Sequence, residues 1–423
     1  MSYSDPKLTH YIQDVCNQIK CKEVHAEIQE ELRSHIDEMV DDLIEEGMPQ
    51  AKAIDKAIEQ MGDASLIGKQ FHQRYKPRMD WSLLGMALAL IGVGLLVMYS
   101  IEHSQSSGIH QTSLVLNKAV AAAIGIGIAA CIFFFDYRKL QKYSYYLYFG
   151  SLFILFLSFV FRGGYINGVP RWDIGIAKIN AIHLSPYLFV IALSGILVQW
   201  DWGKLDSVFK ILLLMFTPSI IYLSTRDLNS LFLWTACSLI VFFASLATRK
   251  QKCIVVSSLI VGLGLIVAYI VAEQSYPSKD PSNWIYIQIK EAFSSAGWWG
   301  HGLTSAHEQL PYAHTDFTFT YFVYAFGWVG GILLCGLVTL FLLRMVRITK
   351  QVRDPFGQIL TKGLIVIFVV KFMRTILMSL GLLPEFGNGL PFISHGGTEF
   401  LLQMMAVGLI LSIYRRKDWV LAD

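Results

Sequence analysis

Long apolar runs, separated by short polar segments, fill the chain from residue 81 onward. A helix needs ~20 mostly apolar residues to cross the hydrocarbon core of a bilayer, so each run of that order predicts a membrane span. The ten expected spans are residues 81–101, 114–135, 143–161, 184–200, 208–223, 229–247, 253–273, 317–343, 359–381 and 398–414. Because 54% of the 423 residues are hydrophobic and only 16% are charged, an ordinary soluble protein is excluded. We therefore expect an all-α polytopic membrane protein with about ten transmembrane helices.

Lys and Arg gather in every second loop of this pattern. They follow the second, fourth, sixth, eighth and tenth expected spans, whereas the alternate loops 102–113 and 382–397 contain neither residue. Short loops rich in Lys and Arg stay on the cytoplasmic side of the membrane. We therefore expect a cell-membrane protein with both termini in the cytoplasm and two long exterior segments, at about 162–183 and 274–316.

Residues 1–79 have a different character, because charged residues surround narrow apolar stripes. One stripe recurs every three or four residues along a predicted helix, at Val24, Ile28, Leu32, Ile36, Val40 and Leu43. Shorter stripes follow in 53–61 and 66–71. Such stripes must bury against one another, which predicts a small soluble helical domain over 1–79 ahead of a membrane domain over 80–423. The segment resembles the HAAS or permease-prefix domains of bacterial membrane proteins, and that resemblance implies regulation or protein contact.

A polar cluster, His314, Thr315 and Asp316, stands directly before the apolar run 317–343. One role for it is structural, since Thr or Asp at a helix N-cap satisfies the free N–H groups of the first turn and complements the helix dipole. The other role is chemical. A carboxylate at the exterior mouth of a helix bundle can bind a divalent cation or act as a base. The spacing alone favours capping, whereas the position at the exterior mouth of the bundle, beside an aromatic Gly-rich loop, favours the chemical role.

Two motifs around the last three spans resemble the SEDS family, the FtsW, RodA and SpoVE proteins. The first is AHTDFTFTYFVYAFGWVGG, which matches the family's His-Thr-Asp-Phe-x-Phe pattern and the Gly-rich span after it. The second is GLLPEFGNGLPFISHGGTEF. Its matching residues are Leu383, Pro384, Gly387, Leu390, Pro391, Phe392, Ser394, Gly396 and Gly397. The resemblance covers about residues 81–414, and the family's ten spans agree with the count above.

The resemblance implies a peptidoglycan glycosyltransferase that polymerises lipid II on the outer face of the membrane, in cell-wall synthesis for shape, division or sporulation. An acceptor sugar hydroxyl would attack the anomeric carbon of an undecaprenyl-pyrophosphate-linked glycan. This reaction needs a base near the hydroxyl and positive charge near the leaving pyrophosphate. Asp316 matches the family's essential aspartate and is the expected catalytic residue. The candidate substrate-binding residues are Lys118, Arg171, Gln288, His314, Thr315, Lys371, Arg374, Ser394, Gly396 and Gly397.

Two of these candidates, Lys371 and Arg374, lie one turn apart within the ninth expected span. Cations inside membrane spans are costly and therefore rare, which marks both as functional candidates. A structural alternative stays open, because either cation could pair with Glu385 or Glu399.

Several positions depart from the family pattern. The family's Gln-Pro-Ser-Glu segment reads HLSP here, which puts Pro186 where the family has an acid. Its Pro-Asp-Leu-Gly-Thr segment reads RDLNS and keeps Asp227 and the Leu after it. Thr375 stands at a family Asn, and His301 at a family Lys. These departures indicate a divergent member with reduced or conditional activity as one outcome.

Partners and cofactors follow from the resemblance and not from the spacing of residues. It implies a class B penicillin-binding protein, a transpeptidase, as the membrane partner. We expect a divalent cation, Mg²⁺ or Mn²⁺, at Asp316, no organic cofactor and no nucleic acid. Two other functions fit the same residues: a flippase for lipid-linked precursors, and a catalytically silent scaffold for the transpeptidase.

Overall fold

The structure is a computed structural model that describes residues 5–418 except 21, 23–24, 77, 105–112, 161–164, 167–168, 171, 174–177, 180, 204–205, 226, 258–281, 304–309, 311 and 384–388. The chain forms two compact units. One consists of Met1–Met79 with Tyr414–Asp423, and the other is Asp80–Ile413, called the membrane unit below.

Four helices make up the N-terminal part of the first unit: α1 (Pro6–Asn17), α2 (His25–Glu45), α3 (Gln50–Met61) and α4 (Ala64–Arg74). The expected stripe on α2 is buried from Ile28 to Leu43, while Val24 lies outside the described residues. Helix α1 was not expected, although Leu8, Tyr11, Ile12 and Val15 follow a helical spacing and join the same core.

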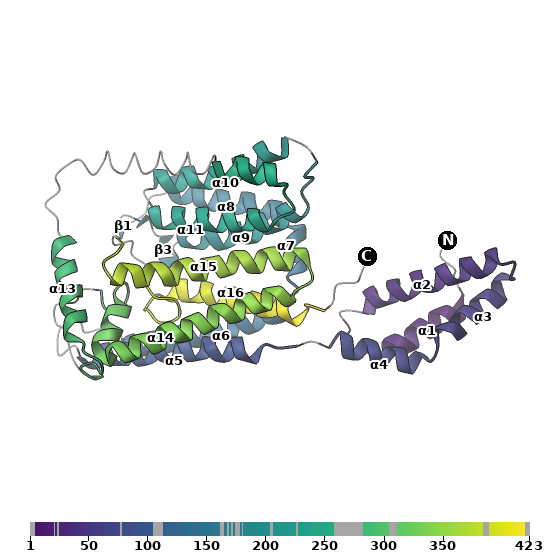
Figure 1. Ribbon diagram of the computed structural model, residues 1–423, viewed down its shortest axis with the longest axis horizontal. Coiled ribbons are helices and arrows are strands. Elements are labelled where there is room, and N and C mark those ends of the chain that lie inside the picture. The colour runs from purple at the N-terminus through teal and green to yellow at the C-terminus, as the bar shows by residue number, and fades with distance from the viewer. Residues whose placement is uncertain are drawn as a thin grey trace. The chain divides into compact units, whose positions relative to one another are not determined.

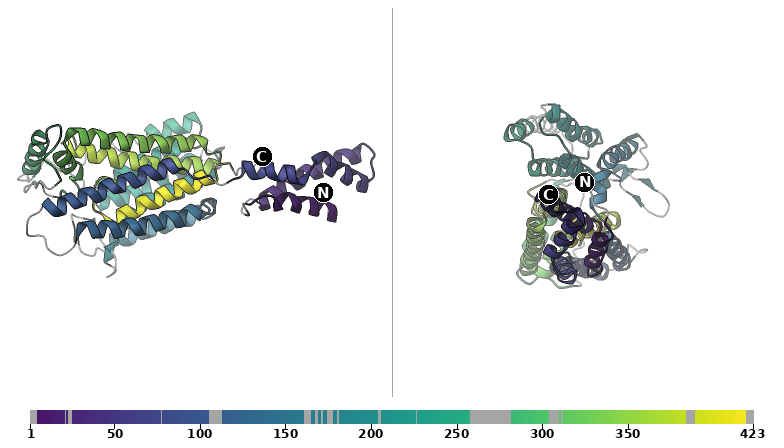
Figure 2. Two further views of the ribbon diagram at one scale, coloured as in Figure 1. Left: turned by 90° about the horizontal axis from the view of Figure 1, so that it is seen from below. Right: turned by 90° about the vertical axis from the view of Figure 1, so that its right-hand side faces the viewer.

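The axes of nine long helices in the described part of the membrane unit lie roughly parallel to one another, as the views in Figures 1 and 2 agree. They are α5 (Trp81–Ser104), α6 (Leu114–Phe134), α8 (Ser144–Val160), α9 (Ala181–Val198), α10 (Asp206–Ser224), α11 (Leu228–Ala244), α14 (Thr318–Gln351), α15 (Pro355–Ser379) and α16 (Gly397–Arg415). Each corresponds to an expected span, and most of the remaining one, 253–273, lies outside the described residues. Within the described residues five helices are long and apolar enough to cross a membrane, and three more are apolar but shorter. The protein is therefore an all-α polytopic membrane protein.

Two of these helices extend past the expected ends. Helix α14 continues to Gln351, beyond the apolar run that ends near residue 343. Helix α15 begins at Pro355, because Asp354 caps it and accepts a hydrogen bond from the Gly357 N–H at 2.7 Å. The extension of α14 contains Arg344, Arg347 and Lys350, which are charged and lie outside the apolar run that marks the span.

Helix α13 (Ser282–Ser295) lies across one end of the membrane unit (Figure 1), called the α13 end below. The expected exterior segment 162–183 contributes two short hairpins, which pair β1 (Tyr165–Ile166) with β2 (Val169–Pro170) and β3 (Trp172–Asp173) with β4 (Lys178–Ile179). Strands of two residues leave no periodic signal in the sequence, so these hairpins were not expected.

Helix α14 is interrupted at Gly327, whose φ of 74° and ψ of 177° are not helical. The Gly-rich segment 297–302 fills the break. The N–H groups of His301 and Gly302 donate to the carbonyls of Tyr324 and Ala325 at 3.1 and 2.9 Å, and the Trp328 N–H donates to the Gly297 carbonyl at 3.1 Å. Backbone groups freed by the break are therefore satisfied inside the protein, as a membrane helix requires.

Candidate active site

Polar residues on or next to four helices converge at the α13 end. Lys118 lies near the start of α6, Asp316 just before α14, and Glu399 in the first turn of α16. Lys371 and Arg374 lie near the end of α15, which runs in the opposite direction. The alternating direction of successive spans thus brings residues far apart in the sequence to one end of the bundle.

Asp316 lies in a turn that leads into α14 and is partly buried. The N–H groups of Thr315 and Phe317 both donate to the Tyr312 carbonyl, at 3.0 and 3.2 Å. The N-cap residue of α14 is Phe317, and it makes no side-chain capping bond. Capping by Thr315 or Asp316 as the N-cap residue, which the spacing favoured, is therefore wrong. Asp316 stands one position before the cap.

The loop 389–397 packs against this turn. The His395 N–H donates to the His314 carbonyl at 2.7 Å. Ser394 accepts from the Leu390 N–H at 2.6 Å and donates to the Thr318 hydroxyl at 2.9 Å. From α6, Lys118 donates to the Ser394 carbonyl at 2.8 Å. The turn and the loop therefore form one hydrogen-bonded wall that contains Ser394 and adjoins Gly396 and Gly397.

Phe392 anchors the same loop in the core. Its backbone has a φ of 64°, unusual for a residue other than glycine, and its N–H donates to the Gln403 side chain at 2.7 Å. The centre of the buried ring lies 5.5 Å from the ring centres of Phe341 and Phe368, and 6.4 Å from that of Phe400. Aromatic contacts and one buried hydrogen bond thus hold the strained residue in place.

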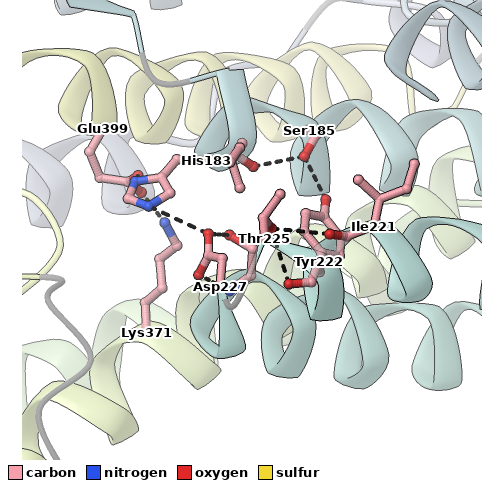
Figure 3. A network of polar contacts seen from close by, with 10 residues as sticks. His183, Ser185, Ile221, Tyr222, Thr225, Asp227, Lys371 and Glu399 are labelled. Carbon is pink, nitrogen blue, oxygen red and sulfur yellow. Dashed lines mark hydrogen bonds and ion pairs between the residues drawn. The ribbon is translucent and has the colours of Figure 1, made fainter. Parts of the chain in front are cut away.

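A second group of polar residues, shown in Figure 3, forms a network of hydrogen bonds and ion pairs at the α13 end. Lys371 forms an ion pair with Glu399, and the Tyr187 hydroxyl donates to the same carboxylate at 3.3 Å. From α9, His183 lies 3.9 Å from Glu399 and 4.0 Å from Asp227. Asp227 also caps α11 through the Ser230 N–H at 3.0 Å. Four helices, α9, α11, α15 and α16, therefore share one network.

Arg374 is 5% exposed, and its Nη2 atom has no hydrogen-bond partner in the described part of the chain. The carboxylates of Glu399, Asp227 and Asp316 lie close enough to act on its guanidinium electrostatically. This interaction connects the polar network with the turn that carries Asp316.

The remaining candidates have different outcomes. Gln288 is buried in α13, and its Oε1 atom makes no hydrogen bond within the described residues. Arg171 lies outside the described residues. His183 and Tyr187 were not among the predicted site residues. Their signal in the sequence is that two polar residues lie one turn apart at the start of an apolar span.

The acid that the family has at the position of Pro186 is absent from this segment, but a carboxylate from another helix lies near it. Pro186 lies in the first turns of α9, between His183 and Tyr187. Both of these residues approach the Glu399 carboxylate, which comes from α16. The α13 end thus keeps a carboxylate beside this segment, from a helix that the sequence motif does not include.

The two histidines of the wall have perturbed acidities. Burial lowers the pKa of the His314 imidazole. Burial also lowers the pKa of His395, with repulsion from His314 and Lys118 adding to the effect. Both rings therefore favour the neutral form.

The fold and the site place this protein among the polytopic membrane proteins that have a polar site at one end of a helix bundle. The sequence pattern of the Cell cycle protein family, FtsW/RodA/SpoVE, matches residues 80–418. The chain therefore belongs to this family.

Individual relatives agree with this assignment. The chain is 27% identical over 364 residues to a Probable peptidoglycan glycosyltransferase FtsW of Trichlorobacter lovleyi, which covers 79% of this chain and 92% of that protein. It is 26% identical over 360 residues to the Peptidoglycan glycosyltransferase MrdB of Escherichia coli K12, covering 81% and 95%. A solved structure of a peptidoglycan synthase complex, described as coordinating polymerization and crosslinking, contains a chain with a TM-score of 0.68 and 22% identity, covering 80% of this chain and 98% of that one. At this identity the structural likeness shows the fold.

Proposed function

We propose that this protein is a peptidoglycan glycosyltransferase that polymerises lipid II on the outer face of the cytoplasmic membrane, at the α13 end. Membership of the family and the names of the relatives support this activity. The observation that carries the site assignment is that Asp316 and Arg374 lie at the same end of the bundle, where this carboxylate acts electrostatically on a buried guanidinium whose Nη2 atom makes no hydrogen bond in the described residues.

In the reaction, the hydroxyl of one lipid-linked sugar attacks the anomeric carbon of a second. A carbon–oxygen bond forms there, and the bond to the undecaprenyl pyrophosphate breaks. Asp316, as the ionised carboxylate, accepts the proton of the attacking hydroxyl. Arg374 offers Nη2 to the negative charge that develops on the departing pyrophosphate. Burial strengthens the effect of Arg374, because its charge is poorly screened by bulk water.

The wall of turn and loop binds the sugars in this proposal. His314, Thr315 and Ser394 supply polar groups, and Gly396 and Gly397 let the substrate approach the backbone closely. Lys118 supports the wall through its bond to the Ser394 carbonyl. Gln288 offers a buried acceptor from α13, and the motif alone implies a substrate-binding role for Arg171.

A divalent cation fits this site only in part. No group of three or more His, Cys, Asp or Glu side chains that could hold a metal is found among the described residues. Mg²⁺ in proteins is often held by one or two carboxylates together with substrate phosphates. Asp316 would be the protein ligand, and the ion would neutralise pyrophosphate charge. The proposed roles of Asp316 and Arg374 do not require this ion.

The orientation and the partner are also part of the proposal. We place both termini in the cytoplasm, because Lys and Arg concentrate in the loops at the end opposite α13. We propose a class B penicillin-binding protein as the partner. The related chain in a peptidoglycan synthase complex supports this assignment.

The test is polymerisation of purified lipid II by the purified protein, with Mg²⁺ and the candidate transpeptidase, followed on a glycan-length gel. Wild type should give chains, and Asp316→Ala and Asp316→Asn should not, because neither side chain can accept the proton. Glu291→Ala is the matched control, since it removes an exposed carboxylate from α13 at the same end of the bundle.

Three results would count against the proposal. Chains from Asp316→Ala at the wild-type rate would refute the catalytic assignment. No chains from folded, partner-bound wild type would favour the scaffold function. Transfer of lipid II across vesicle membranes without polymerisation would favour the flippase.

A further inference from the structure

Two buried cations one turn apart on α15 have different surroundings. Lys371 and Arg374 are both 5% exposed, and the sequence offers them for the same role. Two like charges so close in a membrane interior repel each other strongly, because the dielectric constant is low. The protein must therefore neutralise at least one of them.

Lys371 is the cation that the structure neutralises. Its ammonium pairs with Glu399 of α16 and lies 5.2 Å from the ring centre of Tyr187. The Tyr187 hydroxyl donates to the same Glu399 oxygen at 3.3 Å. The carboxylate comes from α16 and the ring and hydroxyl from α9, so groups on two other helices contact the ammonium on α15. Such a paired charge is poorly placed to bind a substrate.

Arg374 has no comparable partner in the described residues, and Glu385, the other carboxylate expected to pair with either cation, lies outside them. The Nη2 atom of Arg374 is buried and makes no hydrogen bond, although three carboxylates act on its guanidinium from a distance. A buried cationic donor without a partner is costly, and an anionic ligand would satisfy it.

From this contrast we infer that Glu399 is a positioning residue, which holds Lys371 away from the substrate and leaves Arg374 as the cation that binds the pyrophosphate. The inference rests on the proposed function and assigns roles within its site. Lys371 and Glu399 then act as a neutral pair, and the charge available to the anion is that of Arg374 alone.

This division of roles makes a distinctive prediction for paired substitutions. Lys371→Met alone leaves the Glu399 carboxylate without its lysine and able to neutralise Arg374 instead, and Glu399→Gln alone leaves an uncompensated buried lysine. Each should lower kcat/KM about tenfold or more. The double variant removes both charges, so it should return to within about threefold of wild type.

Arg374→Met supplies the contrast. It should lower kcat by roughly tenfold to a hundredfold, the effect of one hydrogen bond to a charged group, in the wild-type and the double-variant background alike. Lys362→Met is the matched control, because it removes a partly buried lysine from the same helix far from the polar network.

The experiment measures initial rates of lipid II polymerisation against lipid II concentration, with the thermal midpoint of each variant in parallel. A double variant that folds like wild type but is as inactive as Arg374→Met would overturn the inference and give Lys371 a direct role. Single variants with wild-type kcat/KM would overturn it too. If wild type itself makes no chains, the proposed function fails instead.

A binding measurement keeps the inference testable where a variant folds poorly. Inorganic pyrophosphate should raise the thermal midpoint of wild type and of the charge-swapped variant, Lys371→Glu with Glu399→Lys, but not of Arg374→Met. The opposite pattern, stabilisation of Arg374→Met but not of the swapped variant, would show that Lys371 holds the anion.

Discussion

Gly300→Ala tests how the segment 297–302 completes the broken helix α14. Gly300 has a φ of +76°, and an added Cβ would come within 3.0 Å of backbone atoms of Ala325 and Gly327. The left-handed conformation costs alanine ~1–2 kcal/mol. Relief of the clash moves the segment away from α14 and breaks the bonds that His301 and Gly302 donate, at about 1 kcal/mol each. The expected loss of stability is therefore about 3–4 kcal/mol.

Gly302→Ala separates the two causes. Gly302 has a φ of +95°, but an added Cβ meets nothing within 4 Å, so only the conformational cost of ~1–2 kcal/mol remains. The two variants should differ by about 2 kcal/mol, roughly thirtyfold in the unfolding equilibrium. Tryptophan fluorescence during heating in detergent, at one scan rate, gives the comparison even if unfolding is irreversible. Equal midpoints for the two variants would refute the argument from close packing.

Three further predictions address other parts of the site. Chelation with EDTA should lower polymerisation, and Mg²⁺ or Mn²⁺ should restore it; unchanged activity would remove the cation from Asp316. Phe392→Ala should cost about 3–5 kcal/mol, because it empties a buried aromatic site, whereas Phe134→Ala at an exposed position should cost far less in the same melting assay. The lowered pKa of His395 means that its stabilising contribution is full above pH ~6.5 and is lost as the pH falls toward its folded-state value. The thermal midpoint should therefore decrease as the pH is lowered from about 7 to about 5, and it should decrease less in His395→Gln than in wild type. An equal decrease in the two proteins would contradict this.

The sequence predicted the membrane helices well because hydrophobicity is a property of one segment at a time. Helix ends were less accurate, as at Pro355, where a cap and not an apolar residue sets the boundary. The break in α14 could not be located, since three glycines, at 327, 330 and 331, stand within five residues of the run. Only packing against the segment 297–302 decides that Gly327 is the one that leaves the helical conformation.

The candidate site divides in a similar way. The motif resemblance brought Asp316 forward, whereas its spacing alone favoured a helix cap that the structure assigns to Phe317. The choice between Lys371 as a ligand and Lys371 as an ion-pair partner depended on Glu399, which lies 28 residues away. Such a pairing is decided by how α15 and α16 pack, and no local pattern contains that information.

The anchoring of Phe392 bears on how the site recognises its substrate. A wall whose central residue is fixed among three other rings cannot adjust cheaply to a poorly fitting sugar. If the wall binds the sugars as proposed, the substrate meets a pre-organised surface, and little conformational entropy is lost there on binding. Discrimination at this wall should accordingly follow a lock-and-key pattern, in which an altered saccharide loses affinity and does not reshape the loop.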